Sequence, residues 1–337
     1  MRQHNFFLMF LKIVFFSAIL VSTSSARAEL KVVTTIKPLH SLIANVMDGV
    51  GEPALIIEGS TSPHSFTLKP SHAKLLEEAD IIFWIGEGIE TFMERPLESI
   101  VKNAEVVEFM EIESINKLKF REESIFEEHD DHDDHDDHDK KAKKDDDHDH
   151  DHDSHAKKED GHDDHDEHHH GEFDPHIWLD PINAKAILNE MVEHLIENDA
   201  ANASIYKKNL DKALNELDKL TMNVMTDLNK STASIVFHDA YQYFEERFNV
   251  NVLGAFTVNT DVMPGAEQLK EIREIIEHDN VSCVFSELQF NPDIINAVAK
   301  DMNIKTGILD PLGATLNPGK GLYFDLIKNM SSSFKGC

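Results

Sequence analysis

The stretch Lys31-Val32-Val33-Thr34-Thr35-Ile36 is short and rich in β-branched residues, which favours a strand. Pro38 follows it and begins a helical stretch that continues to Val46, in keeping with the tolerance of proline in the first turn of a helix. A strand followed at once by a helix is the repeating unit of parallel α/β sheets. The fold of the rest of the chain therefore depends on how often this unit recurs.

The strand-helix unit recurs on both sides of a long helical segment in the middle of the chain. Three more strands are expected before that segment and four after it: Ala54–Ile57, Ile81–Ile85, Glu105–Phe109, Ser234–Phe237, Val250–Phe256, Val281–Phe285 and Ile304–Leu309. Further helices are expected over 71–79, 88–102, 239–248, 265–278, 292–301 and 321–334. This alternation predicts parallel sheets that are covered by helices on both faces.

The central segment carries apolar residues at helical spacing and is long. Residues 201–229 would form a helix of about 43 Å at 1.5 Å per residue, which is enough to join two domains rigidly. We therefore predict an α/β fold of two (βα)4-like lobes with parallel sheets. The lobes would comprise residues 29–200 and 230–337, joined by this one long, rigid linker helix.

The N-terminus has the features of a secretory signal peptide. Basic residues flank the start of the apolar run 6–21, and Ala26-Arg27-Ala28 is a small-residue cleavage pattern. We expect residues 1–28 to be removed by cleavage before Glu29. No cysteine lies near this site to carry a lipid anchor, so we expect the mature chain to be soluble and, in a bacterium, periplasmic.

Residues 127–172 interrupt the pattern with an acidic, histidine-rich tract. The tract holds 22 acidic residues against six lysines, a net charge of −16 in a chain whose formal charge is −31. Its only apolar side chains are alanines, so it cannot bury enough surface to offset its ordering entropy. We predict disorder from about Ile112 to Glu172. Such an acidic surface excludes nucleic acid as a partner and favours cations.

Thirteen of the 21 histidines lie in this tract, with the spacings His-Asp-Asp-His and His-Asp-His. They are His129, His132, His135, His138, His148, His150, His152, His155, His162, His165, His168, His169 and His170. A flexible cluster loses conformational entropy whenever it wraps an ion, so its affinity should be below that of a preformed site. Tethering would raise the metal concentration beside such a site. We expect an auxiliary metal loop that captures zinc or limits its uptake; the alternative is a solvated loop without a transport role.

Three histidines outside the tract lie after strands or on a stiff connector. His64 follows the second expected strand, and His238 follows the apolar run 235–237. His176 lies in Asp174-Pro175-His176-Ile177-Trp178-Leu179-Asp180-Pro181, where each proline disfavours helix in the aspartate before it. Ligands gather at the carboxyl ends of parallel strands, so the three side chains can meet in a cleft between the lobes. Three imidazoles suit Zn²⁺.

Asp310, at the end of the last expected strand, is a fourth candidate ligand. Extra carboxylate oxygens would suit Mn²⁺ better than Zn²⁺. Each candidate also has a purely structural alternative, because a lone histidine at a strand end is usually a hydrogen-bonded polar residue and an aspartate before proline can cap a turn. The histidines within the expected helical stretches are interpreted as structural or surface residues: His40, His72, His194 and His278.

The chain has only two cysteines, Cys283 and Cys337. An exported chain meets an oxidising compartment, which favours a single disulfide between them. The alternative is a buried free thiol at Cys283, within the apolar run 281–285. A disulfide that closes this loop of more than fifty residues would stabilise the folded state by about 4 kcal/mol in the chain-entropy model. It would also hold the C-terminus in place.

Four segments resemble the zinc-uptake substrate-binding proteins of ABC transporters, the ZnuA type: Pro63–Ser71, Asp174–Pro181, Phe237–Tyr241 and Leu309–Gly313. The resemblance covers nearly the whole mature chain, in order. It implies two βα lobes bridged by one long helix, zinc in the interlobe cleft, and an acidic His-rich loop ahead of the second ligand. Position by position, it implies His64, His176 and His238 as ligands and a disulfide in the second lobe between the two cysteines.

One departure from the family concerns the fourth ligand. Some zinc members place a glutamate immediately before the first ligand, where this chain has Pro63. A water molecule, Asp310 or a tract histidine could fill that place instead. Zinc is expected to be the transported ligand.

The expected function is the high-affinity capture of Zn²⁺ in the periplasm and its delivery to an inner-membrane permease that is driven by a cytoplasmic ATPase. The chain would be a monomeric binding protein and not an enzyme. Three alternatives stay open: a manganese-binding homologue that uses Asp310, a zinc-dependent hydrolase, and a zinc buffer without a permease. Against the hydrolase, no His-Glu-x-x-His motif supplies a general base.

Overall fold

A computed structural model describes residues 29–337 except 122, 127–170, 229–231, 259 and 261. The expected signal peptide and all thirteen tract histidines lie outside the described residues. Within the described part of the chain, no helix is long and apolar enough to cross a membrane.

The first lobe is built on a four-stranded parallel sheet with the strand order β2-β1-β3-β4. Its strands are β1 (Val32–Thr34), β2 (Ala54–Leu55), β3 (Ile81–Trp84) and β4 (Glu105–Glu108). In register, Val33 of β1 lies beside Ile82 of β3, which lies beside Val106 of β4. All four residues of β3 are buried, which matches its position in the middle of a sheet that is covered on both faces.

The second lobe repeats this arrangement with the strand order β6-β5-β7-β8. Its strands are β5 (Ser234–His238), β6 (Val252–Thr257), β7 (Cys283–Glu287) and β8 (Lys305–Leu309). Each lies within a few residues of its predicted position, and every pairing is parallel. β5 therefore has two neighbours in the sheet: β6, which follows it in the sequence, and β7, which does not.

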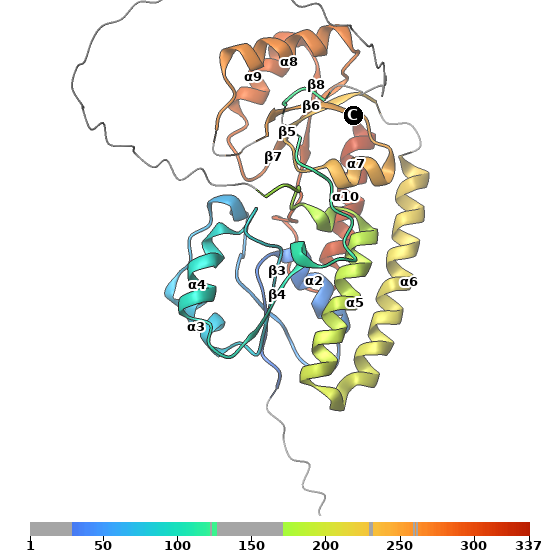
Figure 1. The fold of residues 1–337 in the computed structure, drawn as a ribbon. Helices are drawn as coiled ribbons and strands as arrows, with labels where there is room; N and C mark the ends of the chain where they lie inside the picture. Colours follow the sequence, from blue (N-terminus) through green and yellow to red (C-terminus); the bar gives the residue numbers. More distant parts are fainter. Residues whose placement is uncertain (1–28, 122, 127–170, 229–231, 259, 261) are drawn as a thin grey trace, which may run out of the picture. The chain divides into compact units, whose positions relative to one another are not determined.

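Helices cover both faces of the first sheet, with α3 and α4 on one side and α2 and α5 on the other (Figure 1). The α-helices are α2 (Lys37–Val46), α3 (Pro70–Glu78), α4 (Glu94–Ser99), α5 (Pro181–Asn198), α6 (Ala203–Asp227), α7 (Gln242–Phe248), α8 (Ala266–His278), α9 (Asp293–Met302) and α10 (Leu322–Gly336). The short 3-10 turns are η1 (Pro63–Ser65), η2 (Thr91–Met93), η3 (Phe109–Glu111), η4 (Ile177–Leu179) and η5 (Ala200–Asn202). One helix prediction is wrong, because residues 88–102 form only η2 and the short α4. Pro96 lies in the first turn of α4, where its missing N–H is tolerated, so the helix begins just before it.

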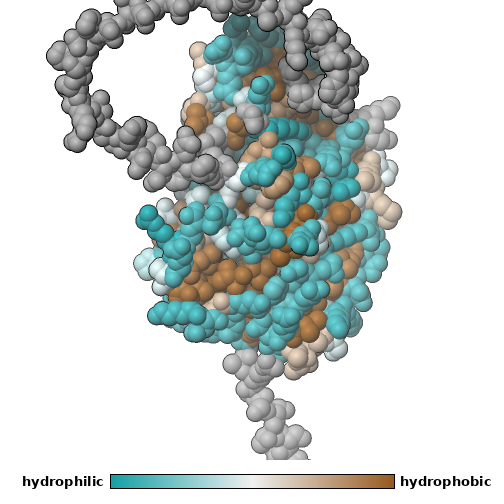
Figure 2. Space-filling view, viewed as in Figure 1, coloured by the Kyte–Doolittle hydropathy of each residue, from teal (hydrophilic) through white to brown (hydrophobic). Residues whose placement is uncertain are grey.

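The predicted linker helix is α6, a helix of 25 residues that joins the two lobes. It lies beside α5 over most of its length (Figure 1) and also contacts α2 and α10. Its buried face repeats at helical spacing through Tyr206, Ala213, Leu217 and Val224. The predicted α/β fold of two parallel-sheet lobes joined by one long helix is therefore confirmed. Hydrophilic side chains dominate the face in Figure 2, apart from an apolar band in the region where β3 and β4 lie.

The start of the predicted disorder is wrong. Residues 112–126 form turns, bridges and hydrogen bonds instead of an irregular tail, with the placement of residue 122 not described. Lys119 forms an antiparallel bridge with Phe173, and Ile125 forms one with Gly254 of β6. Backbone hydrogen bonds to distant segments compensate for the small number of apolar side chains here. Sequence composition cannot register such bonds, because every residue except proline offers the same donor and acceptor.

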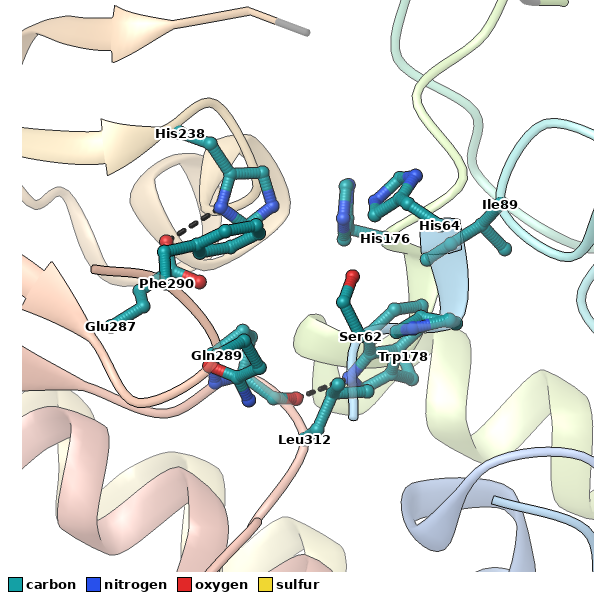
Figure 3. A pocket seen from close by; sticks show the side chains of 12 residues that line it. Ser62, His64, Ile89, His176, Trp178, His238, Glu287, Gln289, Phe290 and Leu312 are labelled. Carbon is teal, nitrogen blue, oxygen red and sulfur yellow. Dashed lines mark hydrogen bonds and ion pairs between the residues drawn. The ribbon is translucent and has the colours of Figure 1, made fainter. Parts of the chain in front are cut away.

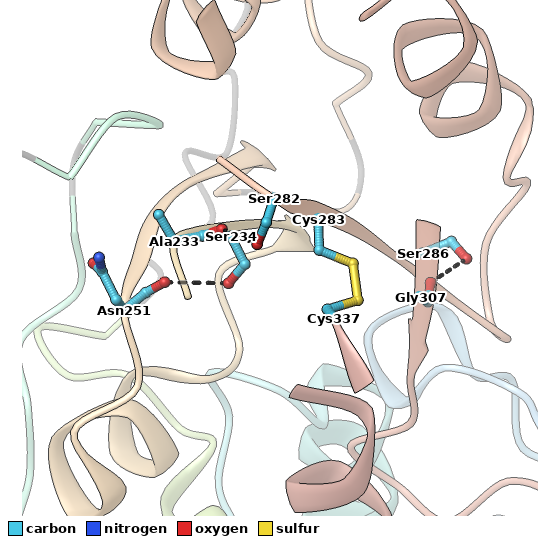
Figure 4. The surroundings of a disulfide bond; sticks show 8 residues. All are labelled: Ala233, Ser234, Asn251, Ser282, Cys283, Ser286, Gly307 and Cys337. Carbon is cyan, nitrogen blue, oxygen red and sulfur yellow. Dashed lines mark hydrogen bonds between the residues drawn. A yellow bond between two sulfur atoms is a disulfide. The ribbon is translucent and has the colours of Figure 1, made fainter. Parts of the chain in front are cut away.

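The C-terminal helix α10 packs against elements of both lobes, namely α2, α6 and β8. The backbone N–H of Tyr323 donates to Ser41 Oγ at 3.0 Å, and its hydroxyl donates to the carbonyl oxygen of Trp178 at 2.7 Å. Beyond this helix, Cys337 forms the predicted disulfide with Cys283 of β7, with 5.6 Å between the Cα atoms (Figure 4). The bond fastens the end of the chain to the middle of the second sheet.

Candidate metal site

A small cavity lies at the carboxyl ends of β5 and β7, where the second lobe faces the connector that carries His176 (Figure 3). Its volume of about 10 Å³ is room for roughly one water-sized particle. The lining residues are Ser62, Pro63, His64, Ile89, His176, Trp178, His238, Glu287, Gln289, Phe290, Pro311 and Leu312. The three predicted histidines therefore line the same small cavity.

Each of the three imidazoles comes from a different kind of element. His64 lies in η1 after β2, His176 immediately precedes η4, and His238 is the last residue of β5. Their ring centroids are 5.4 to 6.0 Å apart. One ligand atom from each lies within 4.8 Å of those of the other two. Ligand atoms around a tetrahedral zinc ion are about 3.4 Å apart, so small side-chain adjustments would let the three bind one ion.

The connector holds His176 firmly. Asp174 Oδ1 accepts a hydrogen bond from the backbone N–H of His176 at 2.9 Å. Trp178 packs beside the imidazole and donates its Nε1–H to the carbonyl oxygen of Pro311 at 2.8 Å. Asp180 is extended, as predicted, and caps α5 by accepting from the N–H of Ile182. The Asp-Pro pairs thus restrict the backbone on both sides of the ligand.

A buried carboxylate lies behind two of the imidazoles. Nδ1 of His176 is 2.7 Å from Asp174 Oδ1, and Nδ1 of His238 is 2.6 Å from Glu287 Oε1. A carboxylate accepts, so in each pair Nδ1 carries the proton and leaves Nε2 with its lone pair for a metal ion. Nε2 of His238 is buried without a hydrogen-bond partner, and in Figure 3 it points toward the other two imidazoles. Such an orphaned lone pair fits a metal ligand.

Glu287 was not predicted from the sequence. Its one available signal was its position at the end of β7, two residues beyond the apolar run that marked the strand. Only the sheet order makes β7 the neighbour of β5, so that Glu287 lies next to His238.

Burial and nearby charges shift the pKa values of the two histidines in opposite directions. Burial lowers the pKa of His176 well below its usual value, and the nearby His238 adds to that shift. Burial alone would also lower the pKa of His238, but the charge of Glu287 and its hydrogen bond outweigh burial and raise it overall. Burial also raises the pKa of Asp174 to about 7. Buried carboxylates therefore influence the pKa values and the orientation of these imidazoles, and no ligand motif in the sequence would reveal them.

Comparison with known proteins identifies the family. Residues 32–337 match the family described as "Zinc-uptake complex component A periplasmic". The chain belongs to the ZnuA family. A high-affinity zinc uptake system protein ZnuA of Brucella abortus is 45% identical over 308 residues, with 91% of each chain covered. The protein of the same name from Yersinia pestis is 34% identical over 324 residues, covering 95% of each.

A solved structure supports the fold assignment. A ZnuA deletion mutant with zinc bound superposes with a TM-score of 0.67 at 21% identity, and the match covers 91% of this chain and 97% of that one. At this identity the likeness establishes the fold alone. The resemblance to the ZnuA family that the four sequence segments indicated is confirmed.

In this member of the ZnuA family, Asp310 does not join the three histidines. It is not among the residues whose ligand atoms gather there, and it does not line the cavity. Its Oδ1 instead accepts from the backbone N–H of Leu312 at 3.3 Å and from Gln289 Nε2 at 3.4 Å. These contacts are those of an aspartate that caps a turn.

A second His/Glu group lies between β4 and α5, comprising Glu105, His194 and Glu197. Nδ1 of His194 contacts Glu105 at 2.6 Å, and its Nε2 contacts Glu190 at 3.2 Å. Both nitrogens are thus engaged by carboxylates within a partly exposed ion-pair network. Other helical histidines also have structural contacts: His40 Nε2 lies 3.1 Å from the carbonyl oxygen of Pro53, and His72 Nδ1 accepts from the N–H of Lys69.

Proposed function

We propose that this chain is the periplasmic substrate-binding component of a zinc-uptake ABC transporter. It would bind one Zn²⁺ through a ring nitrogen of each of His64, His176 and His238. The observation that carries the proposal is the convergence of three imidazoles from distant segments on one small cavity, with Nε2 of His238 buried and unpaired. Relatives that are 34% to 45% identical are named as high-affinity zinc uptake proteins, which supports the same metal.

The partners follow from this role. Zinc is the cargo and not a resident cofactor, and it would pass to an inner-membrane permease that is coupled to a cytoplasmic ATPase. The chain would act as a monomer, exported by residues 1–28 and cleaved before Glu29, and it would perform no catalytic step. The fourth ligand would be a water molecule, since no fourth protein ligand atom gathers with the three nitrogens in the described part of the chain.

The experiment that tests this function is calorimetric titration of the mature chain with Zn²⁺ and, in competition, with Mn²⁺. One tight zinc event per chain is expected, with manganese far weaker, because the three side chains whose ligand atoms gather here all offer nitrogen. A preference for manganese would instead favour the homologue function that uses Asp310. Loss of growth in zinc-poor medium when the gene is deleted would connect binding to uptake.

The tract is proposed as an auxiliary zinc-capturing segment, and its removal is a separate prediction. Replacing residues 127–170 with a short glycine-serine linker should lower the total number of zinc ions bound while leaving the tight event intact. Calorimetry on the two chains side by side measures both quantities. An unchanged total stoichiometry would contradict the capture role, and loss of the tight event would show that the tract supplies a ligand.

Zinc affinity should fall as the pH is lowered, because zinc binds only an unprotonated Nε2. Glu287 holds the pKa of His238 above its usual value of 6.5, so protonation should begin to compete with zinc above pH 6.5. Below that pKa, affinity should drop about tenfold per pH unit for one proton. The pKa of His176 lies well below 6.5, so it adds no second proton in this range. Chelator competition between about pH 5.5 and 8 measures this profile; a flat profile would contradict it.

A further inference from the structure

A segment that connects the two lobes lies beside the proposed metal site. We call residues 116–121 and 123–126 the strap. At its first end, the backbone N–H of Asn116 donates to Asn183 Oδ1 of α5 at 2.9 Å, and Asn183 Nδ2 donates back to the Asn116 carbonyl oxygen at 2.9 Å. At its other end, the N–H of Phe126 donates to the carbonyl oxygen of Leu253 at 2.9 Å. The strap therefore begins on the first lobe and ends on the edge strand of the second sheet.

The end on β6 is closely fitted. The N–H of Ala255 donates to the carbonyl oxygen of Ser124 at 2.8 Å, and Ile125 pairs with Gly254 in an antiparallel bridge. A Cβ atom on Gly254 would lie 2.6 Å from the Ser124 carbonyl oxygen, so only glycine allows the strap to approach this near. The strap thus adds one bridged residue pair beside β6 and covers backbone groups that β6 would otherwise expose.

Arg121, in the middle of the strap, binds two buried carboxylates of the second lobe. Its guanidinium lies 2.9 Å from Asp239 Oδ1 and 2.7 Å from Glu245 Oε2, and it stacks over the ring of Phe126 at 3.9 Å. The side chains of Asp239 and Glu245 are only 3% and 7% exposed. Asp239 immediately follows His238. Arg121 therefore fixes the residue next to the metal ligand of the second lobe.

The strap also contacts the connector that carries His176. The N–H of Asp174 donates to the carbonyl oxygen of Leu118 at 2.8 Å. Tyr243 of α7 donates its hydroxyl hydrogen to the Asp174 carbonyl oxygen at 2.6 Å and accepts from the N–H of Leu118 at 3.0 Å. Asp174 in turn binds Nδ1 of His176. The strap thus joins the supports of two imidazoles, one from each lobe.

We propose that Arg121 is a positioning residue for the metal site. Through its contacts with Asp239 and through the strap, Arg121 holds the side chain of His238 in position relative to His176. This restraint slows the release of bound zinc. The inference rests on the proposed function, since it assumes zinc in the cavity. Neither carboxylate that Arg121 binds has to become a ligand for this role.

The test is the rate at which zinc leaves the full chain. Chain loaded with one equivalent of Zn²⁺ is mixed with excess chromophoric chelator in a stopped-flow instrument. Arg121→Gln should speed the slow, tight-site phase by about tenfold or more, as expected for loss of an outer partner of a metal ligand. Arg121→Lys retains the charge but cannot bridge both carboxylates in a planar fork, so it should give an intermediate rate. It also serves as the folded variant if the glutamine variant does not fold.

Arg247 offers a matched control. Its guanidinium binds both oxygens of Asp180 at 2.7 Å, also between the lobes, and its side chain is 28% exposed against 27% for Arg121. Neither member of that pair is next to a histidine ligand. Arg247→Gln should lower the melting temperature while leaving the zinc dissociation rate near the wild-type value.

Two results would overturn the positioning role: wild-type rates in both Arg121 variants, or an equal acceleration in Arg247→Gln, which would reduce the effect to general stability. The visible spectrum of Co²⁺-loaded chain gives an independent readout, because a shifted imidazole changes the ligand field. It should change in the Arg121 variants and not in Arg247→Gln. If the wild-type chain itself has no slow phase, then the proposed function fails, and this inference fails with it.

Discussion

Replacing His238 with alanine is expected to weaken tight zinc binding by about 10²- to 10³-fold. A structural zinc site is worth roughly 10–16 kcal/mol over four ligands, so the loss of one ligand should cost about 3–4 kcal/mol. The ligand atoms of His64 and His176 would stay in place, but two nitrogens cannot hold the ion as three do. Calorimetry should therefore show loss of the tight event, with the weaker binding of the tract preserved.

The control for this experiment is His278→Ala. His278 is an exposed residue at the end of α8, outside both groups of possible metal ligands in the described chain. Its replacement should leave the tight event unchanged. Survival of the tight event in His238→Ala would mean that zinc binds elsewhere, and the proposed site would be wrong.

Glu287→Gln is expected to weaken zinc binding by about 10- to 100-fold, although Glu287 is not proposed as a ligand. The change keeps the size of the side chain and an oxygen that can accept from Nδ1 of His238, but it removes the negative charge. A divalent ion among neutral imidazoles in a buried cavity needs nearby counter-charge, since isolated charges are costly in such surroundings. Asp174 and Glu287 lie behind two of the three proposed ligands, and Glu287 in particular would supply it. Chelator competition at constant pH measures the loss.

Glu90→Gln is the matched control for that loss. Glu90 is also a fully buried carboxylate, but it accepts from the backbone N–H groups of Ile85 and Gly86 and, among the described residues, hydrogen-bonds to no imidazole. Its neutralisation should leave zinc affinity near the wild-type value. Glu287→Gln should also move the fall in affinity to lower pH, because Glu287 raises the pKa of His238. An affinity equal to the wild type in Glu287→Gln would rule out charge compensation at this position.

Much of the fold could be predicted because its signals are local. The apolar run Ile81–Ile85 is buried on both faces as β3, and the apolar stripe of 201–229 became α6 with only small changes at its ends. The three histidines were also predictable, since strand ends and a doubly restrained Asp-Pro connector are visible in the sequence. The rule that parallel strands bring their carboxyl ends to one edge accounts for the positions of His64 and His238, each within its own sheet, but not for that of His176 on the connector.

The carboxylates and the strap could not be predicted in this way. Glu287 has no local mark that pairs it with His238, because the contact depends on β7, and not only β6, being a neighbour of β5. Arg121 lies in a stretch whose composition indicated disorder. That stretch is nevertheless ordered, because it forms hydrogen bonds with segments that are distant in the sequence. Asp310 is the opposite case. Its position after a strand indicated a metal ligand, but its side chain makes the contacts of an aspartate that caps a turn.

The sequence by itself therefore determined two parallel-sheet lobes, the long helix between them and the three imidazoles that favour zinc. These features depend on periodicity, residue type and strand ends, which are properties of short segments. Only the tertiary structure decided which buried carboxylate orients which imidazole and how the strap links the two halves of the site. Apart from the local pair of Asp174 and His176, those contacts join residues 49 or more positions apart and therefore depend on how the strands are arranged in the sheets.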